Sequence, residues 1–351
     1  MLIGAGLDGR LGLRFDELRD AGQVAARVGF ESLWTPAGGI PDAFHVCAAW
    51  ALGTPLRTGI AVVPAARMWS PLALAAQAAT VGQLSDGRFV LGIGTGGYGP
   101  WFWASVGMPN RPIAVMRDYL TVVRALLEGE TVTYDGPALR LRDASLGVRG
   151  LPRVPVYLGA LGSQMLRLAG ELADGALLNW ATTDRIAESR RALGEGAARA
   201  GRDPAEMTLT MYIRVCVDED IDAARHALGN QVLSYAMAQP GTPLTSGYRG
   251  LFAEMGFGEV LSELEERKDS GEPVGALVSA IPDEFLKSVG YFGSAAGAAQ
   301  AFGRLSQGLD ETIVRIVTAH PGLEPVMATL EALTPERIRK ALEVRGAGRA
   351  P

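Results

Sequence analysis

Two glycine-rich stretches of the chain each follow a short apolar run that is typical of a buried parallel strand. The first stretch lies between such a run at residues 154–158 and a helical pattern at 163–172, and it reads Gly159, Ala160, Leu161, Gly162, Ser163. Backbone N–H groups at a helix start, the positive end of the helix dipole and a serine hydroxyl suit a bound phosphate. An ordinary capped helix would use the same residues, so both interpretations stay open at this point.

The second stretch, "LGIGTGGYG" at residues 91–99, has glycine at nearly every second position. Glycine lets a ligand approach the backbone closely, and Thr95 offers a hydroxyl beside Gly96. The pattern lacks the spacing of a Rossmann dinucleotide site, and a flexible loop is the alternative. Among the aromatic residues that follow, Trp101 and Trp103 are candidates for one wall of an apolar substrate pocket. Packing within the protein is their alternative role.

The chain has three histidines, two of which are candidates for proton transfer. His320 follows the last strand-like run, where a neutral imidazole can relay a proton. His45, near the start of a helical pattern, is the second candidate. Arg214 lies inside a strand pattern and requires a partner if it is buried. Cys47 and Cys216 are isolated and have no metal-binding or redox spacing, so we expect no metal site.

A regular alternation of strands and helices has to position these candidates. Apolar runs predict strands at residues 2–7, 32–35, 58–63, 88–94, 154–158, 175–178, 208–217 and 312–317. Helical spacing predicts helices at residues 15–28, 42–52, 71–84, 113–128, 163–172, 183–200, 220–237 and 323–332. This alternation predicts an α/β fold of the (β/α)8 TIM-barrel type, with a doubly wound open sheet as the alternative. Chemistry in such a barrel takes place at the C-terminal ends of the strands.

Two segments of the chain are additional to the eight strands and eight helices of a minimal barrel. Residues 131–142 predict a β-hairpin with Asp135 and Gly136 at its turn. Residues 239–308, between the seventh and eighth strands, are too long for a plain crossover. We expect them to form a helical insertion over the barrel mouth, and we expect residues 1–351 to form a single domain that includes it.

The composition narrows the class of protein. Hydrophobic residues make up 48% and charged residues 20% of the chain, which is typical of a globular protein rather than a disordered one. The formal net charge of −5 argues against nucleic acid as a partner. We expect no membrane contact, since no apolar stretch reaches about 18 residues. We expect a cytoplasmic location, since the first residues lack the basic region of a signal peptide.

Three segments of the chain, in this order, resemble the bacterial-luciferase-like monooxygenase superfamily. They are residues 70–96 (SPLALAAQAATVGQLSDGRFVLGIGTG), 111–136 (RPIAVMRDYLTVVRALLEGETVTYDG) and 154–179 (VPVYLGALGSQMLRLAGELADGALLN). Within it the chain looks closest to the coenzyme F420-dependent (deazaflavin) oxidoreductases. That branch includes methylenetetrahydromethanopterin reductase and F420-dependent glucose-6-phosphate dehydrogenase. The resemblance covers residues 29–217. It implies a (β/α)8 barrel that holds the cofactor ring across the strand ends, and a homodimer.

The resemblance also implies which residues bind the cofactor. Its phosphate would lie in the loop of residues 159–163, and Thr95 and Gly96 would lie beside the cofactor. A non-proline cis peptide bond behind the ring would fall at Ile60–Ala61.

The chain departs from the family after the second strand. Better-known members carry an acid followed by a histidine there, whereas this chain has Ala37 and Gly38, which cannot titrate. Asp42, a little further on, is either a helix cap or a catalytic acid. The leading prediction is an enzyme that transfers a hydride between F420 and a small organic substrate. The alternatives are an FMN-dependent monooxygenase of the same superfamily and a flavin-binding barrel without turnover, which the missing acid–histidine pair permits.

Overall fold

The computed structural model describes residues 1–64, 69–96, 100–108 and 110–347. Parallel strands alternate with helices along these residues, and the fold is a (β/α)8 barrel, as the sequence predicted. The chain divides into two compact units. The first unit comprises residues 1–30, 179–188 and 211–351, and the second unit comprises residues 31–178 and 189–210.

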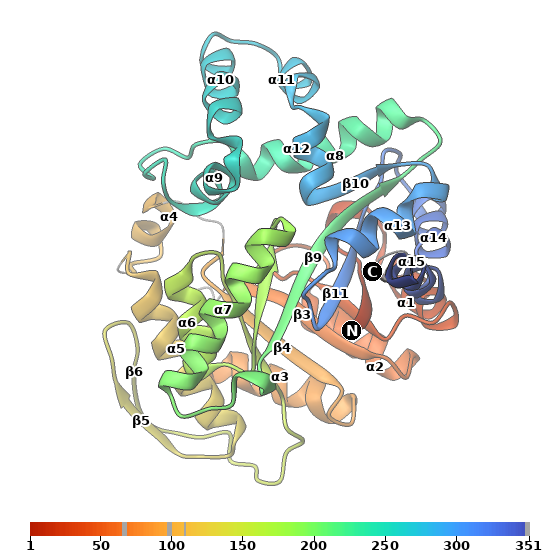
Figure 1. Ribbon diagram of the computed structural model, residues 1–351. Coiled ribbons are helices and arrows are strands. Elements are labelled where there is room, and N and C mark those ends of the chain that lie inside the picture. The colour runs from red at the N-terminus through yellow and green to blue at the C-terminus, as the bar shows by residue number, and fades with distance from the viewer. Residues whose placement is uncertain (65–68, 97–99, 109, 348–351) are drawn as a thin grey trace. The chain divides into compact units, whose positions relative to one another are not determined.

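The second unit contains the strands that precede the glycine-rich stretches. Its strands pair in parallel in the order β2 (Ser32–Thr35), β3 (Arg57–Pro64), β4 (Phe89–Gly94), β7 (Val156–Gly159) and β8 (Gly175–Asn179). Its helices are α2 (Ala43–Gly53), α3 (Pro71–Leu84), α4 (Pro100–Ser105), α5 (Pro112–Leu127), α6 (Ser163–Leu172), most of α7 (Thr183–Arg199) and the 3-10 turn η2 (Pro204–Glu206) (Figure 1). Every residue of β4 is buried, as expected of a parallel strand that is covered on both faces.

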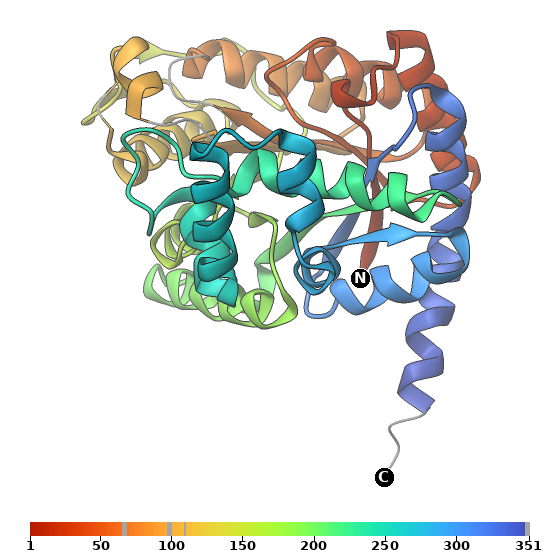
Figure 2. The same ribbon diagram turned by 90° about the horizontal axis from the view of Figure 1, so that it is seen from above.

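The first unit contains both ends of the chain and the long segment before the last strand. Its strands pair in the order β10 (Gly290–Gly293), β9 (Thr208–Val217), β11 (Glu311–Val317) and β1 (Leu2–Gly6). Its helices are η1 (Gly9–Leu11), α1 (Phe15–Arg27), α8 (Ile221–Ala236), α9 (Gly247–Phe252), the π-helical turn η3 (Ala253–Phe257), α10 (Gly258–Asp269), α11 (Val274–Ala280), α12 (Asp283–Val289), α13 (Ala295–Leu305), α14 (Leu323–Ala332) and α15 (Pro335–Ala347). Helices α11 and α12 lie alongside α8 (Figure 2).

The predicted strands and helices are confirmed to within two residues at each end. Asp42 precedes α2, and its carboxylate accepts the backbone N–H of His45 at 3.1 Å, so it acts as a helix cap. Pro71 occupies the first turn of α3 after Ser70, as expected of a proline that needs no N–H partner there.

The elements that were not predicted include β10, α4 and α15. Strand β10 has four residues with glycine at both ends, too little for a strand signal, and it pairs with the second half of β9 from Arg214 to Val217. Residues 239–308 therefore contain a strand as well as helices. That they cover the barrel mouth, and that the whole chain is one domain, stay predictions.

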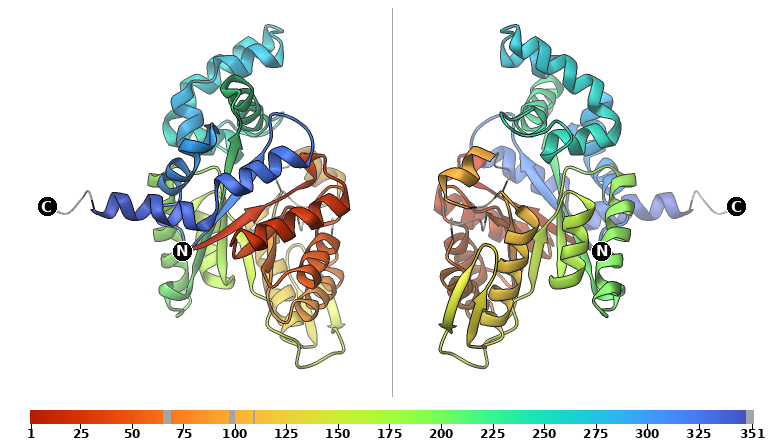
Figure 3. Two further views of the ribbon diagram at one scale, coloured as in Figure 1. Left: turned by 90° about the vertical axis from the view of Figure 1, so that its right-hand side faces the viewer. Right: turned by 90° about the vertical axis from the view of Figure 1, so that its left-hand side faces the viewer.

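The predicted hairpin is formed by β5 (Val132–Asp135) and β6 (Arg140–Ala144), which lie beside α5 (Figure 3). Asp118 of α5 is almost fully buried and holds the turn. Its carboxylate accepts the Tyr134 hydroxyl at 2.8 Å and the backbone N–H groups of Ala138 and Leu139 at 2.7 and 3.1 Å. A buried carboxylate with three donors needs no cation to satisfy it.

Helices α6 and α7 approach each other closely through two glycines. A Cβ atom on Gly170 would lie 2.1 Å from the Leu193 carbonyl oxygen, and one on Gly196 would lie 2.0 Å from the Arg167 carbonyl oxygen. Neither backbone can retreat without moving its helix. Because α6 begins at the first glycine-rich stretch, this contact helps to fix the position of that stretch.

We predict that Gly196→Ala lowers the free energy of unfolding by about 1–3 kcal/mol, because the added methyl group overpacks the contact between α6 and α7. Gly194→Ala in the same helix is the matched control. Its Cβ would meet nothing closer than Pro204 at 3.5 Å, so the better helix propensity of alanine should leave stability unchanged or raise it by up to about 1 kcal/mol. Urea unfolding measures both, and equal stabilities would show that the two helices have room to separate.

Candidate functional site

The ends of β3, β4 and β7 meet around the side chain of Val62. A Cβ atom on Gly94 would lie 2.9 Å from one Val62 methyl group, and a Cβ atom on Gly159 would lie 3.0 Å from the other. Both positions favour glycine, because a side chain there would crowd Val62. Glycine thus lets the three strand ends lie close together, and Gly159 leads from them into the first glycine-rich stretch.

The non-proline cis peptide bond lies at Ala61–Val62, one residue later than the resemblance implied. Ala61 belongs to the bond, but Ile60 precedes it and is fully buried. The pairing of β3 with β4 shifts register between Ile60 and Val63.

The first glycine-rich stretch leads directly into α6. Gly162 is the N-cap residue with extended φ and ψ of −95° and 160°, and the first helical hydrogen bond runs from the Leu166 N–H to its carbonyl oxygen at 3.0 Å. Gly162, Ser163 and Gln164 are exposed, and nothing lies within 4 Å of a Cβ placed on Gly162. The helix start thus has open space where N–H groups point outward, as an anion site requires.

Thr95 and Gly96, which directly follow β4, are half-buried. Strand β4 pairs with β7, which leads into the first glycine-rich stretch. Gly96 has a φ of 73°, and its carbonyl oxygen accepts the Thr95 hydroxyl at 3.1 Å. Tyr98 lies outside the described residues. In α4, Trp103 is buried, whereas Trp101 is 65% exposed, so their role as a pocket wall stays a prediction.

Both candidate histidines lie next to an acid and are exposed. The side chain of His45 is 82% exposed, and its Nδ1 lies 2.7 Å from Asp42 Oδ1. The side chain of His320 is 59% exposed, and its Nε2 lies 3.6 Å from Asp218 Oδ2. An adjacent carboxylate can orient an imidazole for proton transfer, so the geometry leaves both residues available for that role.

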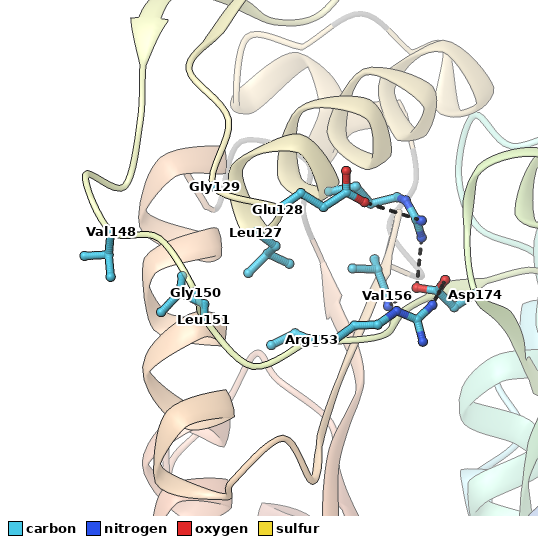
Figure 4. A pocket seen from close by; sticks show the side chains of 11 residues that line it. Leu127, Glu128, Gly129, Val148, Gly150, Leu151, Arg153, Val156 and Asp174 are labelled. Carbon is cyan, nitrogen blue, oxygen red and sulfur yellow. Dashed lines mark hydrogen bonds and ion pairs between the residues drawn. The ribbon is translucent and has the colours of Figure 1, made fainter.

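A pocket of about 370 Å³ in the second unit lies at the start of β7 and just before β8, opposite the strand ends described above (Figure 4). Its polar centre is Asp174. This carboxylate accepts Arg124 Nη1, Arg153 Nη2 and the Val156 N–H, each at 2.8 Å. Because these groups satisfy one another at the N-terminal end of the strands, the pocket has a stabilising role in this fold.

The first unit buries an arginine that forms an ion pair with a carboxylate. Arg315 of β11 donates from Nη2 to Asp8 Oδ2, and Asp8 Oδ1 accepts the Arg10 N–H at 2.7 Å. Burial works against the charge of Arg315, but the Asp8 carboxylate and nearby tyrosines keep its pKa above the ordinary value. Both oxygens of Asp8 are therefore occupied.

Arg214 of β9 is fully buried, but within the part of the chain that the structure describes it has no carboxylate partner. Its Nη1 donates to Asn179 Oδ1 at 2.7 Å, and its guanidinium lies 3.7 Å from the centre of the Trp180 ring. Among the described residues, Arg214 Nε and Nη2 and Trp180 Nε1 are buried without a hydrogen-bond partner. The sequence predicted that Arg214 needs a partner but missed Asn179 and Trp180, although both stand at the C-terminal end of β8.

Burial, with the positive charge of Arg315, lowers the pKa of Arg214 to about 9, against the smaller opposing effect of Tyr235 and Tyr248. A cation whose pKa is lower in the folded protein than in the unfolded chain destabilises the fold while it is protonated in both states. That penalty is fully present below pH 9 and shrinks as the pH rises above it, because the folded protein then binds fewer protons than the unfolded chain.

We predict that Arg214→Met raises the free energy of unfolding at pH 7 by about 1–4 kcal/mol, and that this gain is smaller at pH 10. Arg315→Met is the matched control. It leaves Asp8 buried without its cation and should lower the free energy of unfolding by about 3–5 kcal/mol. Urea unfolding at both pH values measures these changes. A loss of stability in Arg214→Met that matches the loss in Arg315→Met would show that Arg214 is as well compensated as Arg315.

Comparison with known proteins places this geometry in a family. The chain is 31% identical over 218 residues to 5,10-methylenetetrahydromethanopterin reductase of Archaeoglobus fulgidus, covering 62% of this chain and 64% of the relative. It is 30% identical over 223 residues to F420-dependent glucose-6-phosphate dehydrogenase of Microbacterium testaceum, covering 60% of this chain and 66% of the relative. The chain thus spans slightly less than two thirds of the length of these curated relatives.

A solved structure shares the fold over nearly the whole chain. The coenzyme F420-dependent tetrahydromethanopterin reductase of Methanopyrus kandleri matches with a TM-score of 0.74 and 21% identity, covering 95% of this chain and 99% of that one. The family model described as luciferase-like monooxygenase matches residues 2–311, and the chain belongs to this family.

Proposed function

We propose that the protein is an F420-dependent oxidoreductase that transfers a hydride between the deazaflavin and a small organic substrate. The observation that carries the proposal is the open N-terminus of α6 at Gly162, which follows the strand ends that meet around Val62. A side chain at Gly94 or Gly159 would collide with Val62, so glycine at these positions lets the ends of β3, β4 and β7 lie close together beside this helix start. Relatives described as F420-dependent support the choice of F420 over FMN.

The proposed cofactor site has a phosphate end and a ring end. Gly162 and Ser163 would hold the phosphate through N–H groups at the start of α6, with Gly159, Ala160 and Leu161 forming the approach. Thr95 and Gly96 would lie beside the ring, and Ala61 and Val62 behind it, with Ile60 supporting them from the core. When bound, the deazaflavin supplies the carbon that accepts or donates the hydride.

The task of the protein in this proposal is to bind, orient and exclude water. Trp101 and Trp103 are proposed to border the substrate, since aromatic side chains supply contact area with few rotatable bonds. Ala37 and Gly38 offer no titratable group, so any proton is handled elsewhere. His320 is the leading candidate and His45 the second, each with an acid beside it.

We further propose that the protein works as a homodimer in the cytoplasm. Helix α3 carries no charged residue, and its exposed face includes Leu72 and Leu84, as expected of a surface that a second subunit covers.

Within the described part of the chain, no helix combines the length and the apolar character that crossing a bilayer requires.

We predict that Gly162→Asp weakens F420 binding at least about tenfold, because a carboxylate then faces the phosphate at the start of α6. Gly162→Asn is the matched control, since it has nearly the same shape without the charge. Both residues are favoured helix N-caps, so both variants should fold. Titration followed by F420 fluorescence measures the affinities. If the Asp and Asn variants bind F420 equally well, the phosphate lies elsewhere.

We predict that His320→Ala lowers turnover by about 10²–10⁴-fold, the usual contribution of a general acid or base, with little change in F420 affinity. Turnover is followed as the loss or gain of F420 absorbance with an active substrate from a broad panel. A loss smaller than about threefold would remove His320 from the mechanism, and His45→Ala would then be tested in the same assay. If both variants are nearly fully active, the proton comes from water or substrate.

A further inference from the structure

We propose that Arg214, Asn179 and Trp180 bind an oxyanion, and that this oxyanion is a carboxylate group of the substrate. The second part rests on the proposed function, because it assigns the group to the molecule that exchanges the hydride. Asn179 is the last residue of β8 and Trp180 follows it, so the three residues lie where barrel enzymes bind their substrates.

Unsatisfied donors are the first observation. Nε and Nη2 of Arg214 and Nε1 of Trp180 are buried without a partner in the described residues, and all three atoms can only donate. Buried polar groups are nearly always hydrogen-bonded. Three neighbouring donors without an acceptor therefore call for a ligand that brings acceptor atoms.

Nε and Nη2 form the free edge of the Arg214 guanidinium, and this edge has the geometry that binds a carboxylate through two hydrogen bonds. Nε and Nη2 point to the same side of a guanidinium and match the two oxygens of a carboxylate. Other arginines of this chain use that same edge. Arg14 donates from Nε and Nη2 to the two oxygens of Asp16 at 3.1 and 3.0 Å, and Arg267 donates from the same atoms to Glu272.

The charge around Arg214 is not balanced. Among the described residues, the charged and titratable groups that act most on Arg214 are Arg315, Tyr235, Tyr248 and Arg10, and none of them is a carboxylic acid. The carboxylate of Asp8 already accepts hydrogen bonds on both oxygens, one from Arg315 and the other from the backbone N–H of Arg10. A ligand with one negative charge would act as the counterion of Arg214, which lacks a carboxylate among the described residues.

The backbone at Trp180 is held in an unusual conformation. Its φ of 59° is left-handed, which a bulky residue rarely adopts. This conformation accompanies the placement of the indole against the guanidinium of Arg214 at 3.7 Å, so the ring supports the flat face of Arg214 while its edge stays free. Such conformations gather at functional sites.

Access to Arg214 requires a side chain to move, since its Nε and Nη2 have almost no exposed surface. Tyr248, on the six-residue α9, is half-buried and accepts one hydrogen bond from Asn179 Nδ2 at 2.8 Å. Its ring packs edge to face with Tyr235 at 4.7 Å. Tyr248 therefore has few interactions to lose, and its displacement would also free Asn179 Nδ2 to donate to the ligand.

The test uses the full-length protein without cofactor and simple anions as probes. The melting temperature is measured against rising concentrations of acetate, benzoate or inorganic phosphate at constant ionic strength, with benzamide as the uncharged probe. A ligand that binds the folded protein raises the melting temperature in a concentration-dependent way, which yields its affinity. We expect acetate or benzoate to bind at least about tenfold more tightly than benzamide.

Arg214→Gln should weaken carboxylate binding at least about tenfold, whereas Arg14→Gln, which removes an exposed arginine already paired with Asp16, should leave it unchanged. Trp180→Phe keeps the ring, removes only the Nε1–H donor and should weaken binding about threefold or more. It serves as the test if Arg214→Gln does not fold. Equal carboxylate affinity in the wild type and these variants, or no binding to the wild type, would overturn the site. Tighter binding of phosphate would overturn the carboxylate assignment.

F420 affinity is measured on the same variants and separates the two proposals. We expect Arg214→Gln to bind F420 as the wild type does, because the proposed cofactor residues lie on other strands. If the wild type binds carboxylates through Arg214 but does not bind F420, the oxyanion site stands and the proposed function fails. If F420 binds and carboxylates do not, the reverse holds.

Discussion

The side chain of Val62 fits between Gly94 and Gly159, and the proposed cofactor site depends on this contact. Because neither glycine has a Cβ, β3, β4 and β7 can end close together around Val62. Gly159 then leads into α6, whose start is open at Gly162 and whose body is held against α7 by the Gly170 and Gly196 contacts. One steric constraint thus links the packing of three strands to the direction of a helix dipole.

The buried arginines of the first unit differ in whether a carboxylate neutralises their positive charge. Arg315 is paired with Asp8, and Arg249 with Glu265 at 3.2 Å, so these charges are compensated within the chain. Among the described residues, Arg214 has an amide oxygen and the rings of Trp180 and Tyr235 but no carboxylate. A chain that can pair its buried cations but leaves one unpaired tolerates a loss of stability there, and such exceptions are expected where a ligand completes the structure.

Sequence patterns predicted the barrel because most of its signals are local. Apolar runs marked the strands, and Pro71 and Asp42 marked helix starts. What the patterns missed depends on contacts between distant residues. The hydrogen-bond partner of Arg214, Asn179, is 35 residues away in the chain. The glycines of the first stretch were visible, but their meeting with Val62 was not.

Direct titration of the purified protein with F420 and, separately, with FMN tests the central claim that the strand ends hold a deazaflavin. The account predicts saturable binding of F420, followed by its fluorescence, with FMN bound at least about tenfold more weakly, a difference of about 1.4 kcal/mol. Tighter binding of FMN than of F420, or no binding of F420, would contradict it.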